Sequence, residues 1–215
     1  MTVVVAIDGP AGSGKSTLAR RLALELGLPY VNTGLMYRAL ALVAARRGTD
    51  PDDAGALAAL ARGLTFDLDR TLAPPSLTID GEPPGDELEG PDVESIVSRV
   101  ARHPEVRGIL RDRQRALISA GAVVEGRDIG TVVAPEATVK LYLDAAEDAR
   151  VGRRAAQRSS PPLPVGDELV RRDHADARTN PFIPSPDAVV IDTTRLGRDE
   201  VFRTALSVIR KRRRS

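Results

Sequence analysis

The most constraining feature of the sequence is a glycine-rich loop placed between a short strand and a helix. Residues 9–16 read Gly-Pro-Ala-Gly-Ser-Gly-Lys-Ser, which matches the pattern G-x-x-x-x-G-K-[ST] at every fixed position. The β-branched run at residues 3–7 predicts a buried strand, and the apolar repeat at residues 15–26 predicts a helix. This order of strand, loop and helix predicts a P-loop fold.

The chemistry of such a loop follows from its backbone and its lysine. Glycines allow backbone N–H groups to turn inward around phosphate oxygens, and the start of the helix adds its positive end. Lys15 supplies a compact charge for the β- and γ-phosphates, and Ser16 offers a hydroxyl to Mg²⁺. A plain strand-to-helix turn is the alternative, but Lys15 is one of only three lysines against 28 arginines. The predicted ATP-binding residues are Gly9, Pro10, Ala11, Gly12, Ser13, Gly14, Lys15, Ser16 and Thr17, with Ser16 as the metal ligand.

The rest of the chain alternates strands with helices. Further strands are predicted at residues 29–33, 122–125, 137–143 and 189–191, each separated by helical patterns. This alternation predicts an α/β, three-layer fold around a five-stranded, mostly parallel sheet. Two segments do not fit the sheet: small β hairpins at about residues 64–90, standing apart from it, and an arginine-rich helical pair at about 148–180 with a loop at 159–164.

Composition excludes several classes of protein. The 215 residues contain no cysteine, so disulfides, cysteine-based zinc sites and thiol nucleophiles are impossible. The net charge of +1 offers no extended field for nucleic acid, and the basic run at residues 210–214 is interpreted as a solvated helix end. No apolar run approaches the ~20 residues of a membrane span, and residues 1–10 lack the features of a signal peptide. We expect a cytoplasmic monomer with no nucleic-acid or membrane partner.

Three further motifs carry a resemblance to a known family. No guanine-reading N-K-x-D motif is present, which argues against a GTPase. Residues 32–38 read N-T-G-L-M-Y-R, residues 125–131 read E-G-R-D-I-G-T, and residues 172–176 read R-D-H-A-D. Together with the P-loop they resemble the bacterial cytidylate kinases, in the same order and over essentially the whole chain. The resemblance implies transfer of the γ-phosphate of MgATP to CMP and dCMP.

The resemblance also implies a division of the chain and a set of site residues. The core would be formed by residues 1–32, 105–147 and 182–215. A monophosphate-binding domain that includes the small β insert would span residues 33–104, and a lid would span residues 148–181. The implied catalytic residues are Lys15, Arg38, Arg127 and Arg172. The implied CMP-binding residues are Thr33, Tyr37, Arg38, Ser98, Arg107, Gly126, Arg127, Asp128, Arg172, Asp176 and Arg178. Asp128 would accept a hydrogen bond from the cytosine 4-amino group.

Plainer interpretations of the same residues stay open. Arg38 could be a surface arginine, Ser98 an ordinary helix residue, and Asp128 a turn residue that caps the segment after it. Arg172 and Asp176 could form an exposed helix ion pair. Another small P-loop kinase, acting on AMP, UMP or a non-nucleotide such as shikimate, would share much of the pattern.

The end of the predicted lid departs from the family pattern. An arginine is expected three residues after Asp176, but Thr179 occupies that position. Arg178, Arg171, Arg153 or Arg154 could compensate for it. Neither histidine of the chain is expected to act as a base, because a phosphate acceptor is already anionic.

Overall fold

The computed structural model describes residues 2–158, 162–179 and 181–212. The strands are β1 (Val4–Asp8), β2 (Tyr30–Asn32), β3 (Phe66–Asp69), β4 (Ser76–Ile79), β5 (Ala122–Glu125), β6 (Val139–Asp144) and β7 (Val189–Asp192). The helices are α1 (Lys15–Leu26), α2 (Thr33–Arg46), α3 (Ala54–Gly63), α4 (Pro91–Ala101), α5 (Pro104–Ile118), α6 (Glu147–Arg158), α7 (Pro162–Thr179) and α8 (Arg198–Arg212). Two short helical turns, η1 (Asp86–Glu89) and η2 (Ile129–Val133), complete the order.

The centre of the molecule is a five-stranded sheet in the order β2-β5-β1-β6-β7, and each neighbouring pair is parallel. The prediction of a five-stranded parallel sheet is therefore confirmed. Val5, Ala6 and Ile7 of β1 are fully buried, because helices cover both faces of the central strand. The carboxyl ends of parallel strands meet at one edge, which is where such folds place ligands.

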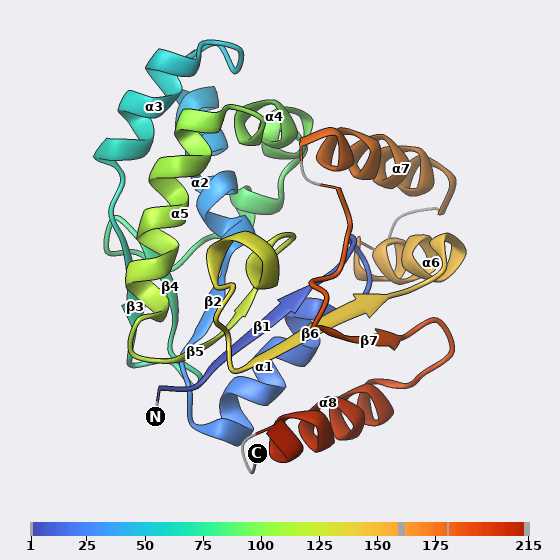
Figure 1. The fold of residues 1–215 in the computed structure, drawn as a ribbon. Helices are drawn as coiled ribbons and strands as arrows, with labels where there is room; N and C mark the ends of the chain where they lie inside the picture. Colours follow the sequence, from blue (N-terminus) through green and yellow to red (C-terminus); the bar gives the residue numbers. More distant parts are fainter. Residues whose placement is uncertain (1, 159–161, 180, 213–215) are drawn as a thin grey trace.

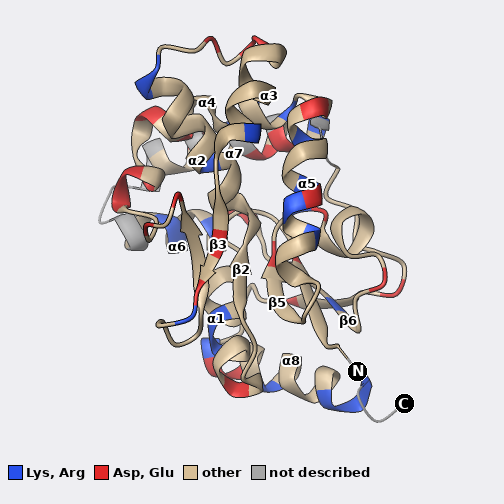
Figure 2. Ribbon diagram, turned by 90° about the vertical axis from the view of Figure 1, so that its left-hand side faces the viewer, with Lys and Arg blue, Asp and Glu red and all other residues tan. Residues whose placement is uncertain are grey.

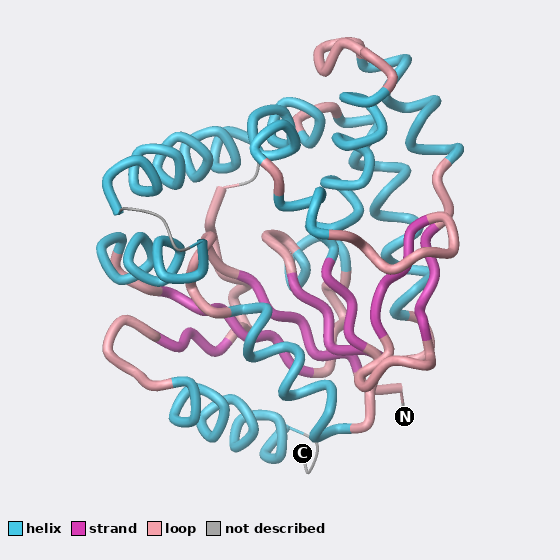
Figure 3. The backbone as a smooth tube through the Cα atoms, turned by 180° about the vertical axis from the view of Figure 1, so that it is seen from behind, coloured by secondary structure: helices cyan, strands magenta, loops and turns pink. Residues whose placement is uncertain are grey.

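Three apolar clusters hold the layers together. One packs α1 and α8 against the sheet through Leu22 and Ile209 (Figure 1). A second covers the opposite face, where Val124 meets Ile118 of α5 and Ile129 of η2. The third lies inside the group formed by α2, α3, α4 and α5, apart from the sheet. The helical group therefore has its own core, and α6 and α7 form a separate pair beside it (Figure 3).

The predicted β insert is a single hairpin. β3 and β4 pair antiparallel, and η1 follows them where further strand structure was predicted. The hairpin forms its own two-stranded sheet, but the Tyr30 N–H donates to the Pro75 carbonyl at 2.9 Å and so joins the insert to the edge strand β2. The expectation that the insert stands apart from the main sheet is therefore only partly right.

The boundary of α7 corrects a second expectation. The loop predicted at residues 159–164 is shorter than expected, because α7 begins at Pro162 and not near residue 166. Proline fits the first turn of a helix, where its missing N–H would have no partner. Residues 159–161 lie outside the described part of the chain.

Basic residues at the C-terminal end of α8 lie at the edge of the molecule (Figure 2). Arg210 lies 3.3 Å from Glu25, and Arg212 donates to the Asp187 carbonyl at 3.4 Å. Arg213 and Arg214 are outside the described residues. None of the described helices is both long enough and apolar enough to cross a membrane.

Candidate active site

The P-loop needs glycine at positions where the backbone is left-handed or closely packed. Gly9, Gly12 and Gly14 have φ angles of +144°, +76° and +96°. A Cβ on Gly9 would lie 2.2 Å from the Leu143 carbonyl oxygen, so no other residue fits there. The loop therefore turns tightly from β1 into α1 and leaves its amides at the carboxyl edge of the sheet.

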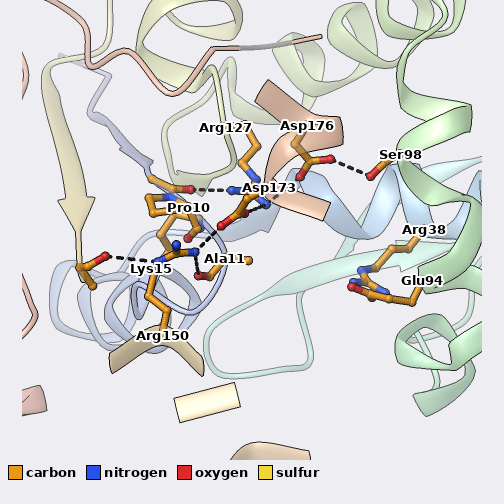
Figure 4. A network of polar contacts seen from close by, with 12 residues as sticks. Pro10, Ala11, Lys15, Arg38, Glu94, Ser98, Arg127, Arg150, Asp173 and Asp176 are labelled. Carbon is orange, nitrogen blue, oxygen red and sulfur yellow. Dashed lines mark hydrogen bonds and ion pairs between the residues drawn. The ribbon is translucent and has the colours of Figure 1, made fainter. Parts of the chain in front are cut away.

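Polar groups in the loop fit a bound phosphate. The Lys15 ammonium reaches back and donates to the Pro10 carbonyl at 2.7 Å (Figure 4). The Ser13 hydroxyl is buried and has no hydrogen-bond partner among the described residues. A buried polar atom of this kind usually has a partner, and a phosphate oxygen would supply one. Thr17 follows in the first turn of α1 and is exposed.

Ser16 lies next to Glu125, which begins the E-G-R-D-I-G-T motif but was not among the predicted site residues. Its hydroxyl donates to Glu125 Oε2 at 3.0 Å, and the Tyr30 hydroxyl donates to Glu125 Oε1. Glu125 is 3% exposed and closes β5, the neighbour of β1. Its place as the first residue of that motif, at the end of a buried strand, was the available signal.

A hydroxyl and a nearby carboxylate are the protein groups that Mg²⁺ takes beside nucleotide phosphates. Within the described residues there is no group of three or more acidic, histidine or cysteine side chains that could hold a metal alone. Ser16 and Glu125 thus fit a cation that completes its shell with phosphate and water.

The predicted acceptor side begins at α2. Thr33, the first residue of α2, donates from its hydroxyl to the Glu125 carbonyl at 2.8 Å. Arg38 is 7% exposed, donates to the Leu88 carbonyl at 2.7 Å and forms an ion pair with Glu94. Arg38 is therefore a buried, paired arginine, and the interpretation as a surface residue is wrong.

The turn after β5 brings several predicted residues together. Arg107 of α5 contacts Asp128 Oδ2 at 2.6 Å. The Tyr37 hydroxyl is buried beside this pair, and its burial raises the pKa of Tyr37 to about 12. A Cβ on Gly126 would lie 2.6 Å from the Thr33 hydroxyl, so glycine allows α2 to approach the turn. The π-helical turn η2 begins directly after Asp128, and such turns are frequent at functional sites.

Asp176 connects this turn to the two outer helix groups. Arg127 donates to Asp176 Oδ2 at 2.8 Å, and Ser98 of α4 donates to Oδ1 at 2.8 Å (Figure 4). Arg127 also lies 3.7 Å from Asp173 and 4.9 Å from the centre of the Phe182 ring. Asp176 thus contacts the turn after β5 and helix α4.

Several residues of the predicted lid, among them Arg150, Asp173 and Arg178, lie around a hollow beside the P-loop. Arg150 of α6 pairs with the buried Asp173 and donates to the Ala11 carbonyl at 3.1 Å. Arg178 is exposed and lines this hollow together with Pro10 and Phe182. The Arg172 side chain lies outside the described residues.

The alternative arginines of the predicted lid are already engaged or exposed. Arg153 donates to Thr193 Oγ1 at 3.0 Å, and Arg154 lies 3.8 Å from Glu89. Arg171 is exposed. Of the histidines, His103 hydrogen-bonds the Pro51 carbonyl at 2.9 Å, and His174 is exposed at the same hollow.

Comparison with known proteins identifies the family. The sequence profile described as Cytidylate kinase matches residues 5–211. The chain belongs to the cytidylate kinase family. A cytidylate kinase of Rhodococcus jostii (strain RHA1) is 42% identical over 98% of this chain and 96% of its own length. That of a Thermus thermophilus strain is 43% identical over 98% of this chain and all of its own length.

Solved structures share the fold with this cytidylate kinase family member at low sequence identity. A gluconokinase from Sinorhizobium meliloti 1021 superposes with a TM-score of 0.51 and 14% identity, covering 97% of this chain and 92% of its own. An uncharacterized protein from Eubacterium ventriosum gives a TM-score of 0.51 and 11% identity, covering 97% and 98%. These likenesses concern the fold alone. The family's members are nucleoside monophosphate kinases with ATP as the phosphoryl donor.

Proposed function

We propose that this protein transfers the γ-phosphate of ATP to CMP and dCMP, producing ADP with CDP or dCDP. The full-length similarity to named cytidylate kinases carries the proposal. The placement of the G-R-D turn beside the P-loop supports it, because Arg127 reaches the Gly9 carbonyl at 3.3 Å. A donor cradle and an acceptor-binding turn are needed side by side for direct phosphoryl transfer.

The chemistry requires two polyanions to meet against their repulsion. Lys15 would hold the β- and γ-phosphates of ATP, and Ser16 with Glu125 would hold Mg²⁺, which neutralises phosphate charge when bound. Five arginines would neutralise the acceptor phosphate and the charge that moves during transfer: Arg38, Arg107, Arg127, Arg172 and Arg178.

Recognition of cytosine is assigned to Asp128. Its Oδ2 atom accepts a hydrogen bond from the Arg107 guanidinium at 2.6 Å. The other carboxylate oxygen can accept a further hydrogen bond. A cytosine 4-amino group donates such a bond, whereas uracil presents a carbonyl oxygen at the same position. Asp128 would therefore favour CMP over UMP.

Existing ion pairs give the arginines partners that a substrate would replace. Arg38 is paired with Glu94, and Arg127 is paired with Asp176. Substrate phosphates would compete with these carboxylates, while Ser98, Thr33, Tyr37 and Asp176 would contact the nucleoside or its phosphate. The assigned lid, residues 148–181, would close over the core, and residues 33–104 would carry the acceptor. We also propose a cytoplasmic monomer with Mg²⁺ as the metal.

An acceptor panel tests the function. Release of ADP is measured with MgATP and CMP, dCMP, UMP, AMP or shikimate, and CMP and dCMP are expected to give the highest kcat/KM. Asp128→Ala is then measured on the best acceptor and on UMP, with Asp112→Ala as the control because Asp112 is exposed on α5. Preference for another acceptor would overturn the proposed substrate, and an unchanged CMP preference in Asp128→Ala would overturn the role of Asp128.

A further inference from the structure

A buried carboxylate at the end of β1 connects the two halves of the site. Asp8 is 7% exposed and directly precedes Gly9, the first residue of the P-loop. Its Oδ1 atom accepts a hydrogen bond from the Ile129 N–H at 2.8 Å, and its Oδ2 atom accepts one from the Gly130 N–H at 2.8 Å. Both oxygens of one carboxylate therefore hold two consecutive amides in a neighbouring segment.

These two amides are the first N–H groups of the π-helical turn η2. The amides at the start of any helical turn lack partners within it, and leaving them buried without partners is costly. Later in the turn, the Val132 and Val133 amides both donate to the Asp128 carbonyl, at 2.8 and 3.1 Å. Asp8 thus fixes the residues immediately after Asp128, and η2 in turn fixes the carbonyl of Asp128 itself.

The residues around the Asp8 carboxylate are tightly packed. A Cβ on Gly130 would lie 3.3 Å from Asp8 Oδ2 and 3.2 Å from the Lys140 side chain, so glycine lets the amide approach. Lys15 and Asp128 lie close enough to act electrostatically on the Asp8 carboxylate. The residue after Asp8 contacts Arg127, which lies two residues before η2: the Gly9 carbonyl accepts a hydrogen bond from Arg127 at 3.3 Å.

We infer that Asp8 is a positioning residue that sets Asp128 and Arg127 relative to the P-loop, and so determines acceptor-base discrimination. This inference rests on the proposed function for its substrate. A carboxylate suits the role because it offers two acceptors to two donors. An asparagine offers one acceptor and places an N–H₂ group against the second amide, which would displace η2.

The first test measures selectivity in Asp8→Asn. We expect the ratio of kcat/KM for CMP to that for UMP to fall at least about ten-fold, whereas KM for ATP changes by less than about three-fold. A CMP/UMP ratio equal to that of the wild type would overturn the inference. So would a rise in KM for ATP as large as the fall in that ratio.

A double-mutant cycle separates positioning from general destabilisation. If Asp8 acts through Asp128, Asp8→Asn should have almost no further effect on the CMP/UMP ratio in an Asp128→Ala background. Additive effects would show that Asp8 acts by another route. Asp53→Ala is the stability control, because Asp53 also accepts a backbone N–H (that of Ala56) but caps α3, and it should leave the ratio unchanged.

Hydrogen exchange on the wild-type protein keeps the test independent of variant folding. The Ile129 and Gly130 amides should exchange as slowly as the Val132 amide, since Asp8 bonds them in the folded state. Rapid exchange at both amides would contradict the claim that Asp8 holds η2 in place. A wild type that prefers an acceptor other than CMP would instead contradict the proposed function, and the exchange result would still decide whether Asp8 anchors η2.

Discussion

The Arg127 guanidinium lies 2.8 Å from the Asp176 carboxylate, and this contact joins the turn after β5 to helix α7. Because Ser98 of α4 donates to the other Asp176 oxygen, one carboxylate holds three segments that are distant in the sequence. The pair is largely buried, with side-chain exposures of 18% and 16%, so water screens it less than a surface pair.

Loss of this carboxylate should loosen α7. In Asp176→Ala without nucleotide, we expect amide hydrogen exchange in the described part of α7 to accelerate about ten-fold, because contacts to both neighbours disappear together. Asp167→Ala is the matched control, since Asp167 is an exposed aspartate on the same helix. Equal exchange in the two variants would mean that Asp176 does not hold the helix in place.

Two variants test whether Arg178 or Arg171 takes the role of the arginine that was expected at the position of Thr179. Arg178 and Arg171 are both exposed on α7, but Arg178 lines the hollow beside Pro10 of the P-loop. We expect Arg178→Ala to lower kcat at least about ten-fold, as removal of a charge that stabilises the transition state does, and Arg171→Ala to have little effect. Initial rates at saturating CMP and ATP make the comparison, and a larger loss in Arg171→Ala would reverse the assignment.

The buried ion pair of Arg38 should be important for stability. The side chains of Arg38 and Glu94 are 8% and 7% exposed, so Glu94→Ala would leave a buried guanidinium that keeps its hydrogen bond to the Leu88 carbonyl but loses this counter-charge. We expect the free energy of unfolding in urea to fall by about 3 kcal/mol. In Glu87→Ala, which breaks the exposed pair with Arg46, the loss should be below about 1 kcal/mol. Equal losses would show that burial of the Arg38 pair adds nothing.

Local sequence patterns predicted most of the fold, because each strand and helix carries its own periodicity. The helix predicted at residues 15–26 and the strand at residues 122–125 have the predicted bounds. The parallel sheet follows from the alternation of these elements. By contrast, the proline-rich start of α7 reads as a loop, and η2 has no periodic signature in five residues.

The site was predictable where a motif fixes the residue type, and it was not predictable where a partner is distant in sequence. Lys15 and Asp128 belong to motifs, so their placement at the sheet edge follows from the strands before them. Glu125 meets Ser16 across 109 positions, and Asp8 meets Ile129 across 121. Long-range hydrogen bonds of this kind depend on sheet order, which a single sequence does not specify.

The buried carboxylate of Asp8 should make stability depend on pH. Burial raises the pKa of Asp8 from its ordinary value of 3.8 to about 6, although the Gly130 and Ile129 amides oppose the shift. Between these two values the folded protein holds a proton that the unfolded chain has lost. The contribution of Asp8 to stability is therefore greatest below about pH 4, falls as pH rises, and is constant above about pH 6.

Comparison with Asp8→Asn isolates this contribution, because asparagine does not titrate. We expect the stability of the wild type relative to Asp8→Asn to fall by about 2 kcal/mol between about pH 4.5 and about pH 7, measured by urea unfolding. Asp187→Asn is the control: hydrogen bonds from Ser185 and Lys140 lower the pKa of Asp187 to about 2, so its stabilisation is lost only at more acidic pH. A relative stability that stays constant across this range would show that Asp8 is already ionised at about pH 4.5, and its burial would then carry no proton-linked cost.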